Sequence, residues 1–197
     1  MSEKKFVLGV TGPSGAGKST LSSLLAENFG AQVLCADKTA REVIDEKVLA
    51  EICAEFGREV FEGDRLNRQK LGKIVFENLE KRQKLNEIIW PRVICKIEAK
   101  VAQTTAKLVV IDVPMLFESG LDKICDRTVA VLKSKELRVE AIMLRDNISK
   151  NEALLRINAQ PDDEFYKRNA DFTLENNGTT KRLKEKFEEW QKSYVNL

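Results

Sequence analysis

Short apolar runs alternate with longer amphipathic stretches along this chain. Five runs, at residues 6–10, 31–35, 108–113, 128–132 and 170–174, have the length and composition of buried strands, and the run at 108–113 is the richest in β-branched residues. Helical patterns separate these runs. The alternation therefore predicts an α/β fold in three layers, with a mostly parallel five-stranded sheet in the middle.

The stretches between the predicted strands repeat their apolar residues at helical spacing. Helices are expected at 19–29, 39–56, 68–78, 81–104, 135–147, 150–160 and 179–194. We expect a break near Asp45, a turn at 62–64, and a kink or restart at Trp90–Pro91. The last helix carries four large side chains on one face, a pattern typical of core packing: Leu183, Phe187, Trp190 and Tyr194.

Length and charge limit the classes of protein to consider. A chain of 197 residues favours a single domain, and its 43% hydrophobic and 32% charged residues are ordinary globular usage. The formal net charge of +2 does not call for a nucleic-acid or membrane partner. We find neither an apolar run long enough to span a bilayer nor a signal peptide ahead of the first strand, so a cytoplasmic protein is expected.

Histidine is absent from the sequence, which excludes histidine-based triads, histidine metal ligands and imidazole acid–base catalysis. A general base must then be a carboxylate, a lysine, a tyrosine or a thiolate. The four cysteines, Cys35, Cys53, Cys95 and Cys125, are far apart and form no CxxC pair. We therefore expect reduced thiols, not a zinc or redox site.

Residues 12–19, GPSGAGKS, match the phosphate-binding pattern GxxxxGK[ST] at every fixed position, between a predicted strand and a predicted helix. In such a loop, backbone N–H groups and the helix N-terminus surround phosphate oxygens. Lys18 would reach the β- and γ-phosphates of ATP, and Ser19 would bind Mg²⁺. The residues expected to contact the nucleotide are Gly12, Ser14, Gly15, Ala16, Gly17, Lys18, Ser19 and Thr20.

Asp112 closes the apolar run at 108–113. In phosphate-binding-loop folds an acidic residue after such a strand makes the second Mg²⁺ contact, usually through water. A helix cap or a surface carboxylate is the alternative interpretation of Asp112.

The remaining motifs favour a small-molecule kinase. The chain lacks the guanine-reading NKxD and the DxxG switch of GTPases, and it is smaller than transport or motor ATPases. A kinase needs a carboxylate near the attacking hydroxyl, and Asp37 follows the second predicted strand. It also needs a basic lid, for which the candidates are Arg138, Arg145, Lys150, Arg156, Lys167 and Arg168, although a solvated charged face is an alternative for each.

Over nearly its whole length the chain resembles the dephospho-CoA kinase family. The loop at 12–19 is common to many families, but the segment DVPMLFE at 112–118 is similar to a more specific family motif. Ala170–Asp171 and the later run NNG at 176–178 belong to the same pattern, as do Ala36–Asp37 and Arg145–Asp146.

This resemblance implies a phosphate-binding-loop kinase domain over residues 1–197, with a helical acceptor-binding insertion at about 65–104 and a lid at about 138–168. It implies transfer of the γ-phosphoryl group of ATP to the ribose 3′-hydroxyl of dephospho-CoA, the last step of coenzyme A biosynthesis, with Mg²⁺. Asp37 would orient or deprotonate the hydroxyl, and Lys18 and Arg145 would stabilise charge. Further assignments are Asn176 or Asn177 near the adenine, and Arg68 and Phe117 near the acceptor, with core packing the alternative for Phe117.

Two positions depart from the usual family residues. Cys35 stands where many members have aspartate, and Trp90 stands where many have histidine before the proline. Trp90 is on the acceptor side, where it could stack on a base or serve as a buried structural residue. The alternatives left open are a kinase of another nucleoside or cofactor, and a nucleotide-binding regulator that has lost catalysis. The oligomeric state is also left open.

Overall fold

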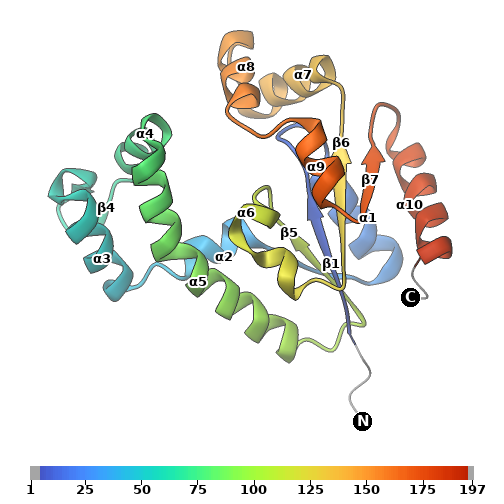
Figure 1. Ribbon diagram of the computed structural model, residues 1–197, viewed down its shortest axis with the longest axis horizontal. Coiled ribbons are helices and arrows are strands. Elements are labelled where there is room, and N and C mark those ends of the chain that lie inside the picture. The colour runs from blue at the N-terminus through green and yellow to red at the C-terminus, as the bar shows by residue number, and fades with distance from the viewer. Residues whose placement is uncertain (1–4, 195–197) are drawn as a thin grey trace. The chain divides into compact units, whose positions relative to one another are not determined.

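The computed structural model describes residues 5–194, and the chain divides into two compact units (Figure 1). One unit, here called the sheet unit, contains the chain up to Cys35 and from Thr104 onward. The other, here called the helical unit, is Ala36–Gln103. The helical unit thus begins at Ala36, whereas the sequence places the start of an insertion near residue 65.

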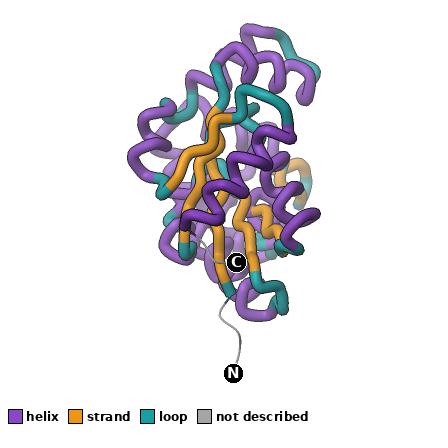
Figure 2. Tube along the Cα trace, turned by 90° about the vertical axis from the view of Figure 1, so that its right-hand side faces the viewer, coloured by secondary structure: helices purple, strands orange, loops and turns teal. Residues whose placement is uncertain are grey.

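The sheet unit is built on five parallel strands. They are β1 (Phe6–Thr11), β2 (Gln32–Cys35), β5 (Leu108–Asp112), β6 (Arg127–Leu132) and β7 (Phe172–Glu175). Their order in the sheet is β2-β5-β1-β6-β7, and every neighbouring pair is parallel. Figure 2 shows these strands, in orange, running side by side. The predicted α/β fold with a five-stranded parallel sheet is confirmed.

Helices cover both faces of this sheet. They are α1 (Lys18–Phe29), α6 (Leu116–Ser119), α7 (Lys135–Asp146), α8 (Lys150–Asn158), α9 (Asp163–Asn169) and α10 (Thr180–Tyr194), with a 3₁₀ turn at Leu121–Ile124. Alternate residues of β6 face opposite sides. Val129 and Val131 pack with α1 and α10, whereas Ala130 and Leu132 pack with Tyr166 of α9. The sheet therefore lies between two helical layers, as expected.

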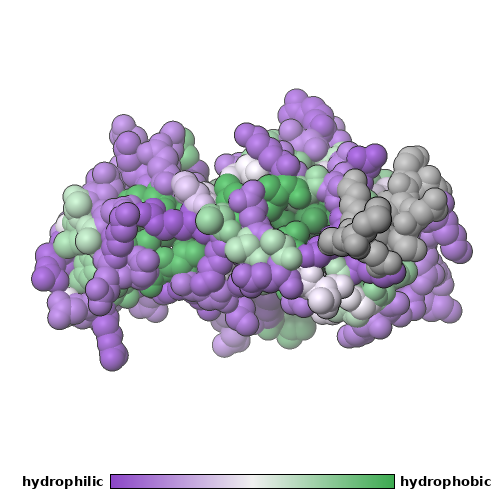
Figure 3. Space-filling model, turned by 90° about the horizontal axis from the view of Figure 1, so that it is seen from below, coloured by the Kyte–Doolittle hydropathy of each residue, from purple (hydrophilic) through white to green (hydrophobic). Residues whose placement is uncertain are grey.

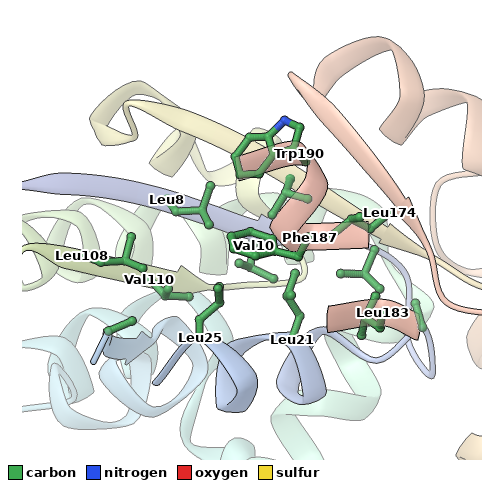
Figure 4. Close-up of a cluster of buried hydrophobic side chains, with 14 residues drawn as sticks. Leu8, Val10, Leu21, Leu25, Leu108, Val110, Leu174, Leu183, Phe187 and Trp190 are labelled. Carbon is green, nitrogen blue, oxygen red and sulfur yellow. The ribbon is translucent and has the colours of Figure 1, made fainter. Parts of the chain in front are cut away.

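The main core lies between the sheet, α1 and α10 (Figure 4). Leu183, Phe187 and Trp190 of α10 are almost fully buried there, as their spacing predicts. The ring of Phe187 meets that of Phe29 edge-on with centroids 5.8 Å apart, and it is tilted against the ring of Trp190 with centroids 5.3 Å apart. The side chain of Tyr194 lies outside the part of the chain that the structure describes.

The helical unit has its own small core. It contains α2 (Ala36–Glu42), α3 (Glu46–Phe56), a 3₁₀ turn (Arg58–Val60), a hairpin of β3 (Phe61–Glu62) and β4 (Arg65–Leu66), α4 (Arg68–Glu77) and α5 (Leu79–Gln103). The break predicted near Asp45 is confirmed, because the Asp45 carboxylate caps α3 by accepting from Val48 N at 2.9 Å. Val48, Ile52, Phe56, Val60 and Leu71 form the buried cluster.

Two expectations about helices differ from the structure. α5 continues through Pro91, so a restart at that position is wrong. Pro91 cannot donate to the carbonyl of Glu87, and both residues are exposed, where water can replace the missing donor. α9 was not expected at all, because its sequence DEFYKRN is short and mostly charged. No helix between residues 5 and 194 is both long and apolar enough to cross a membrane.

Phe187→Ala should lower the free energy of unfolding by about 3–5 kcal/mol, because it leaves a cavity between α10 and the sheet. Denaturant unfolding measures this change. Leu144→Ala, at a side chain of α7 that is 88% exposed, is the control and should change stability by less than about 0.5 kcal/mol. Equal effects of the two substitutions would contradict the described core.

Candidate active site

The glycine-rich loop connects the central strand β1 to α1. Gly17 precedes α1 and has no side chain to cap it, and the first turn of the helix contains no acidic residue. The N–H groups of that turn thus face the loop with the positive end of the helix behind them. Lys18 folds back over the loop, where its Nζ donates to Gly12 O at 2.9 Å and Pro13 O at 3.3 Å.

Gly17 is required by a close contact and by its backbone. Its φ is +101°, and a Cβ at this position would lie 2.3 Å from Nδ2 of Asn176. Asn176 follows β7, 160 residues away in sequence, and its amide donates to Ala16 O at 2.8 Å. The side chain is 7% exposed, so this bond is shielded from water. Asn176 therefore supports the loop from behind.

Asn177 has different surroundings from Asn176. It is exposed, and its Oδ1 accepts from Ser134 N at 2.8 Å, which connects the segment after β7 to the start of α7. The sequence predicts one of these two residues near the adenine of ATP. The contacts show that the buried amide of Asn176 is committed to the loop, and the adenine role stays a prediction.

Ser19 and Asp112, the two predicted metal residues, lie at the same end of the sheet. Asp112 ends β5, beside β1, and its Oδ2 accepts from Ser22 Oγ at 2.9 Å. Ser19 is exposed and lies three residues before Ser22, hence on the same face of α1. The hydroxyl of Ser19 and the carboxylate at the end of β5 thus lie on the same side of α1, and both are oxygen donors that suit Mg²⁺ together with phosphate oxygens and water.

Arg145, in the last turn of α7, is held by its neighbour. Its Nε and Nη2 donate to the two carboxylate oxygens of Asp146 at 2.8 and 2.9 Å, and Arg156 Nη1 reaches Asp146 Oδ2 at 2.5 Å. The hydrogen bonds from Arg145 lower the pKa of Asp146, and the bond to Asp146 raises the pKa of Arg145. Arg145 Nη2 also donates to Ser14 Oγ at 3.4 Å, which brings this arginine to the loop.

Phe117 lies on α6, in the sheet unit. It is half-buried, meets Phe165 edge-on with ring centroids 6.0 Å apart, and packs beside Tyr166. These contacts are core packing, which is the alternative interpretation of Phe117. Contact with an acceptor stays a prediction.

The helical unit contains a separate pocket of about 350 Å³, and two predicted site residues, Asp37 and Arg68, line it. Its other walls come from α2, α3, β4, α4 and α5, and they are largely apolar: Ala40, Ile44, Ile52, Leu66, Leu71, Gly72, Leu85 and Ile89. Figure 3 shows hydrophobic surface, in green, framed by hydrophilic residues at the left of the view, where this unit lies.

Arg41 also lines this pocket, and it was not among the predicted site residues. It lies four residues after Asp37 on α2, so the two side chains share a helix face. That spacing was the available signal. An apolar pocket with one carboxylate and two guanidinium groups suits a ligand with both a flat apolar part and anionic groups. Trp90, half-buried on α5, is not among the lining residues.

The predicted site residues therefore fall into two groups. The loop, Asp112, Phe117, Arg145, Asn176 and Asn177 belong to the sheet unit, and Asp37 and Arg68 belong to the helical unit. Within residues 5–194, no group of three or more cysteine, aspartate or glutamate side chains could hold a metal ion by itself. A divalent ion here would need ligands from a phosphate group and water.

Comparison with known proteins identifies relatives along almost the entire chain. The dephospho-CoA kinase family model matches residues 6–182. The dephospho-CoA kinase of Fusobacterium nucleatum is 40% identical over 185 residues, which cover 93% of this chain and 95% of that protein. A crystal structure from Thermus thermophilus has 30% identity and a TM-score of 0.84, with 98% of this chain and 99% of that chain covered. The dephospho-CoA kinase of Campylobacter jejuni has 27% identity and a TM-score of 0.66, covering 97% and 98%.

Asn176→Asp should weaken ATP binding about tenfold or more and destabilise the fold. A carboxylate cannot donate to Ala16 O, and a buried charge without a partner is costly. Calorimetric titration with ATP and denaturant unfolding measure the two effects. Asn28→Asp is the matched control, because it keeps an oxygen that accepts from Lys184 Nζ at an exposed site outside the predicted nucleotide site, and it should alter neither quantity. Unchanged ATP affinity in Asn176→Asp would contradict a supporting role.

Proposed function

Because this chain belongs to the dephospho-CoA kinase family, we propose how its residues divide the ATP-dependent phosphorylation of dephospho-CoA, a step of coenzyme A biosynthesis. The acceptor atom we propose is the ribose 3′-hydroxyl oxygen. The observation that carries the proposal is the pocket of the helical unit. One carboxylate and two arginines line this pocket, in a chain that also has a phosphate-binding loop.

The loop binds the triphosphate of ATP in this proposal. Backbone N–H groups of Gly15–Thr20 and the N-terminus of α1 surround phosphate oxygens, as the loop pattern implies. Lys18 leaves the carbonyl oxygens of Gly12 and Pro13 and pairs with the β- and γ-phosphates. The ammonium group then balances negative charge that the transferred group carries in the transition state.

Ser19 and Asp112 would hold Mg²⁺ that arrives with ATP, Ser19 directly and Asp112 through water. The ion supplies electrostatic stabilisation of the phosphate oxygens. Ser22 donates to Asp112 and so orients the carboxylate toward the face of α1 that carries Ser19. This part of the proposal needs no ligand cluster beyond the two residues.

Dephospho-CoA occupies the pocket of the helical unit in this proposal. Apolar side chains contact the flat base and the pantetheine arm, and Arg41 and Arg68 pair with the acceptor's phosphates. Asp37 accepts a hydrogen bond from the 3′-hydroxyl and takes its proton as the hydroxyl oxygen bonds to the γ-phosphorus. The bond from that phosphorus to the β,γ-bridging oxygen breaks in the same step, and ADP leaves. Only Ala36 separates Asp37 from the last residue of β2 in the sequence.

Arg145 completes the charge balance. It is tied to Asp146 on α7 and touches the loop at Ser14. An arginine in this place donates to γ-phosphate oxygens as negative charge moves onto the bridging oxygen.

We also place the enzyme in the cytoplasm, which fits its use of ATP and its four free cysteines.

Asp37→Asn should reduce kcat with dephospho-CoA by about 10²–10⁴-fold, because an amide cannot accept the hydroxyl proton. ATP affinity, measured by titration, should stay within about twofold. The matched control is Asp45→Asn in the same unit, since asparagine caps α3 as well as aspartate does. A variant that keeps full activity would favour a role for Asp37 outside catalysis.

The same assay decides acceptor identity. Dephospho-CoA is compared with a panel of nucleosides, each with ATP and Mg²⁺, by following ADP release. Turnover on a nucleoside without turnover on dephospho-CoA would assign the pocket to another acceptor. ATP binding without turnover on any acceptor would indicate a nucleotide-binding regulator.

Arg68→Ala should raise the KM for dephospho-CoA about tenfold or more and leave the KM for ATP unchanged, because it removes charge-assisted hydrogen bonds to the acceptor alone. Steady-state kinetics with each substrate varied in turn measure both constants. Arg65→Ala, three residues earlier and outside the pocket lining, is the control. Equal changes in both KM values would contradict the placement of Arg68 at the acceptor.

A further inference from the structure

We propose that Arg138 and Gln160 are positioning residues that hold the Ser14–Gly15 part of the phosphate-binding loop in the shape that binds ATP. Arg138 is on α7, and Gln160 follows α8. This inference rests on the proposed function of the loop. It concerns two side chains outside the phosphate-binding pattern itself.

Both backbone polar groups of Ser14 are bonded to these side chains. Ser14 N donates to Gln160 Oε1 at 2.8 Å, and Ser14 O accepts from Arg138 Nε at 3.2 Å. The partners are 146 and 124 residues away in sequence. A residue held at both its N–H and its C=O has little freedom to rotate. The following N–H groups of the loop are thereby kept in one orientation.

Arg138 is buried in a way that an ordinary surface arginine is not. It is 5% exposed, and Nη1 lies 3.6 Å from Asp163 Oδ1 of α9, while Nη2 has no hydrogen-bond partner among the described residues. Burial lowers the pKa of Arg138, although Asp163 opposes that change. Burying a guanidinium group with only part of its donors satisfied is unfavourable. The hydrogen bond from Arg138 to Ser14 O explains why this guanidinium group is buried beside the loop.

The backbone of α7 packs on the loop at the same place. Gly15 has φ +78°, and a Cβ there would lie 2.8 Å from Arg138 O and 3.1 Å from Ile142 Cγ1. The helix thus contacts the loop through both the backbone and the side chain of Arg138. α7 also carries Arg145, whose Nη2 donates to Ser14 Oγ. A fixed Ser14–Gly15 segment therefore keeps the loop and Arg145 in a constant position relative to each other.

The experiment compares Arg138→Met and Gln160→Met, which remove each bond to Ser14 while keeping side-chain bulk. Each should raise the Kd and KM for ATP about tenfold, with the KM for dephospho-CoA within about twofold. In the double variant, the increase in the Kd for ATP should be smaller than the product of the two single increases, because both bonds hold the same residue. Lys135→Met is the control, since Lys135 lies on the same helix as Arg138 and donates to Asn158 Oδ1, not to the loop.

Hydrogen exchange gives a readout that does not depend on turnover. The Ser14 amide should exchange faster in Gln160→Met than in the unsubstituted protein, with the core amides of β1 unchanged. If Arg138→Met does not fold, Gln160→Met still tests the inference. Gln160 is only half-buried, so its substitution should disturb the fold less. Unchanged ATP Kd and unchanged Ser14 exchange in Gln160→Met would overturn the inference. Failure of the unsubstituted protein to bind ATP would instead overturn the proposed function.

Discussion

A loop of backbone amides can bind a phosphate group only if its other polar groups are bonded elsewhere. An N–H group that must point at an anion cannot also stabilise the loop, so the shape has to be imposed from outside. In this chain Ala16 O is bonded to Asn176, and Ser14 is bonded on both sides. The sheet unit brings these distant partners to one edge of the sheet.

The order of the strands achieves this. Because β1 is the middle strand, the carboxyl ends of β5 and β6 flank the loop, and the segment after β7 comes next to β6. Asp112 and Asn176 both follow from that arrangement, since each ends or follows a parallel strand. The buried face shared by α1 and α10 keeps the strands in this order. The core that stabilises the sheet unit therefore also supports the strands that carry the loop, Asp112 and Asn176 (Figure 4).

The sequence was sufficient for the parts of the molecule that depend on local pattern. The strands β1, β5 and β6 are buried on both faces and read as apolar runs, and the loop motif has fixed spacing, so both could be predicted. Side-chain direction was not available in the same way. Nothing local indicates that the amide of Asn176 turns to Ala16 O, or that Arg138 is buried when the other basic residues of α7–α9 are exposed. α9 was missed because Phe165 and Tyr166 are its only apolar residues, and two adjacent residues show no helical spacing.

The division into two units has a consequence for specificity. The groups assigned to ATP are on the sheet unit, whereas the pocket assigned to the acceptor is formed wholly by the helical unit. Changes in the pocket, such as those at Leu66 or Leu85, can then alter acceptor preference without touching a phosphate-binding group. Asp37 lies on α2, in the first turn after β2, where the chain passes from one unit to the other. Under the proposed function, the base therefore belongs to the same unit as the acceptor pocket, which explains why it lies outside the sequence pattern of the phosphate-binding loop.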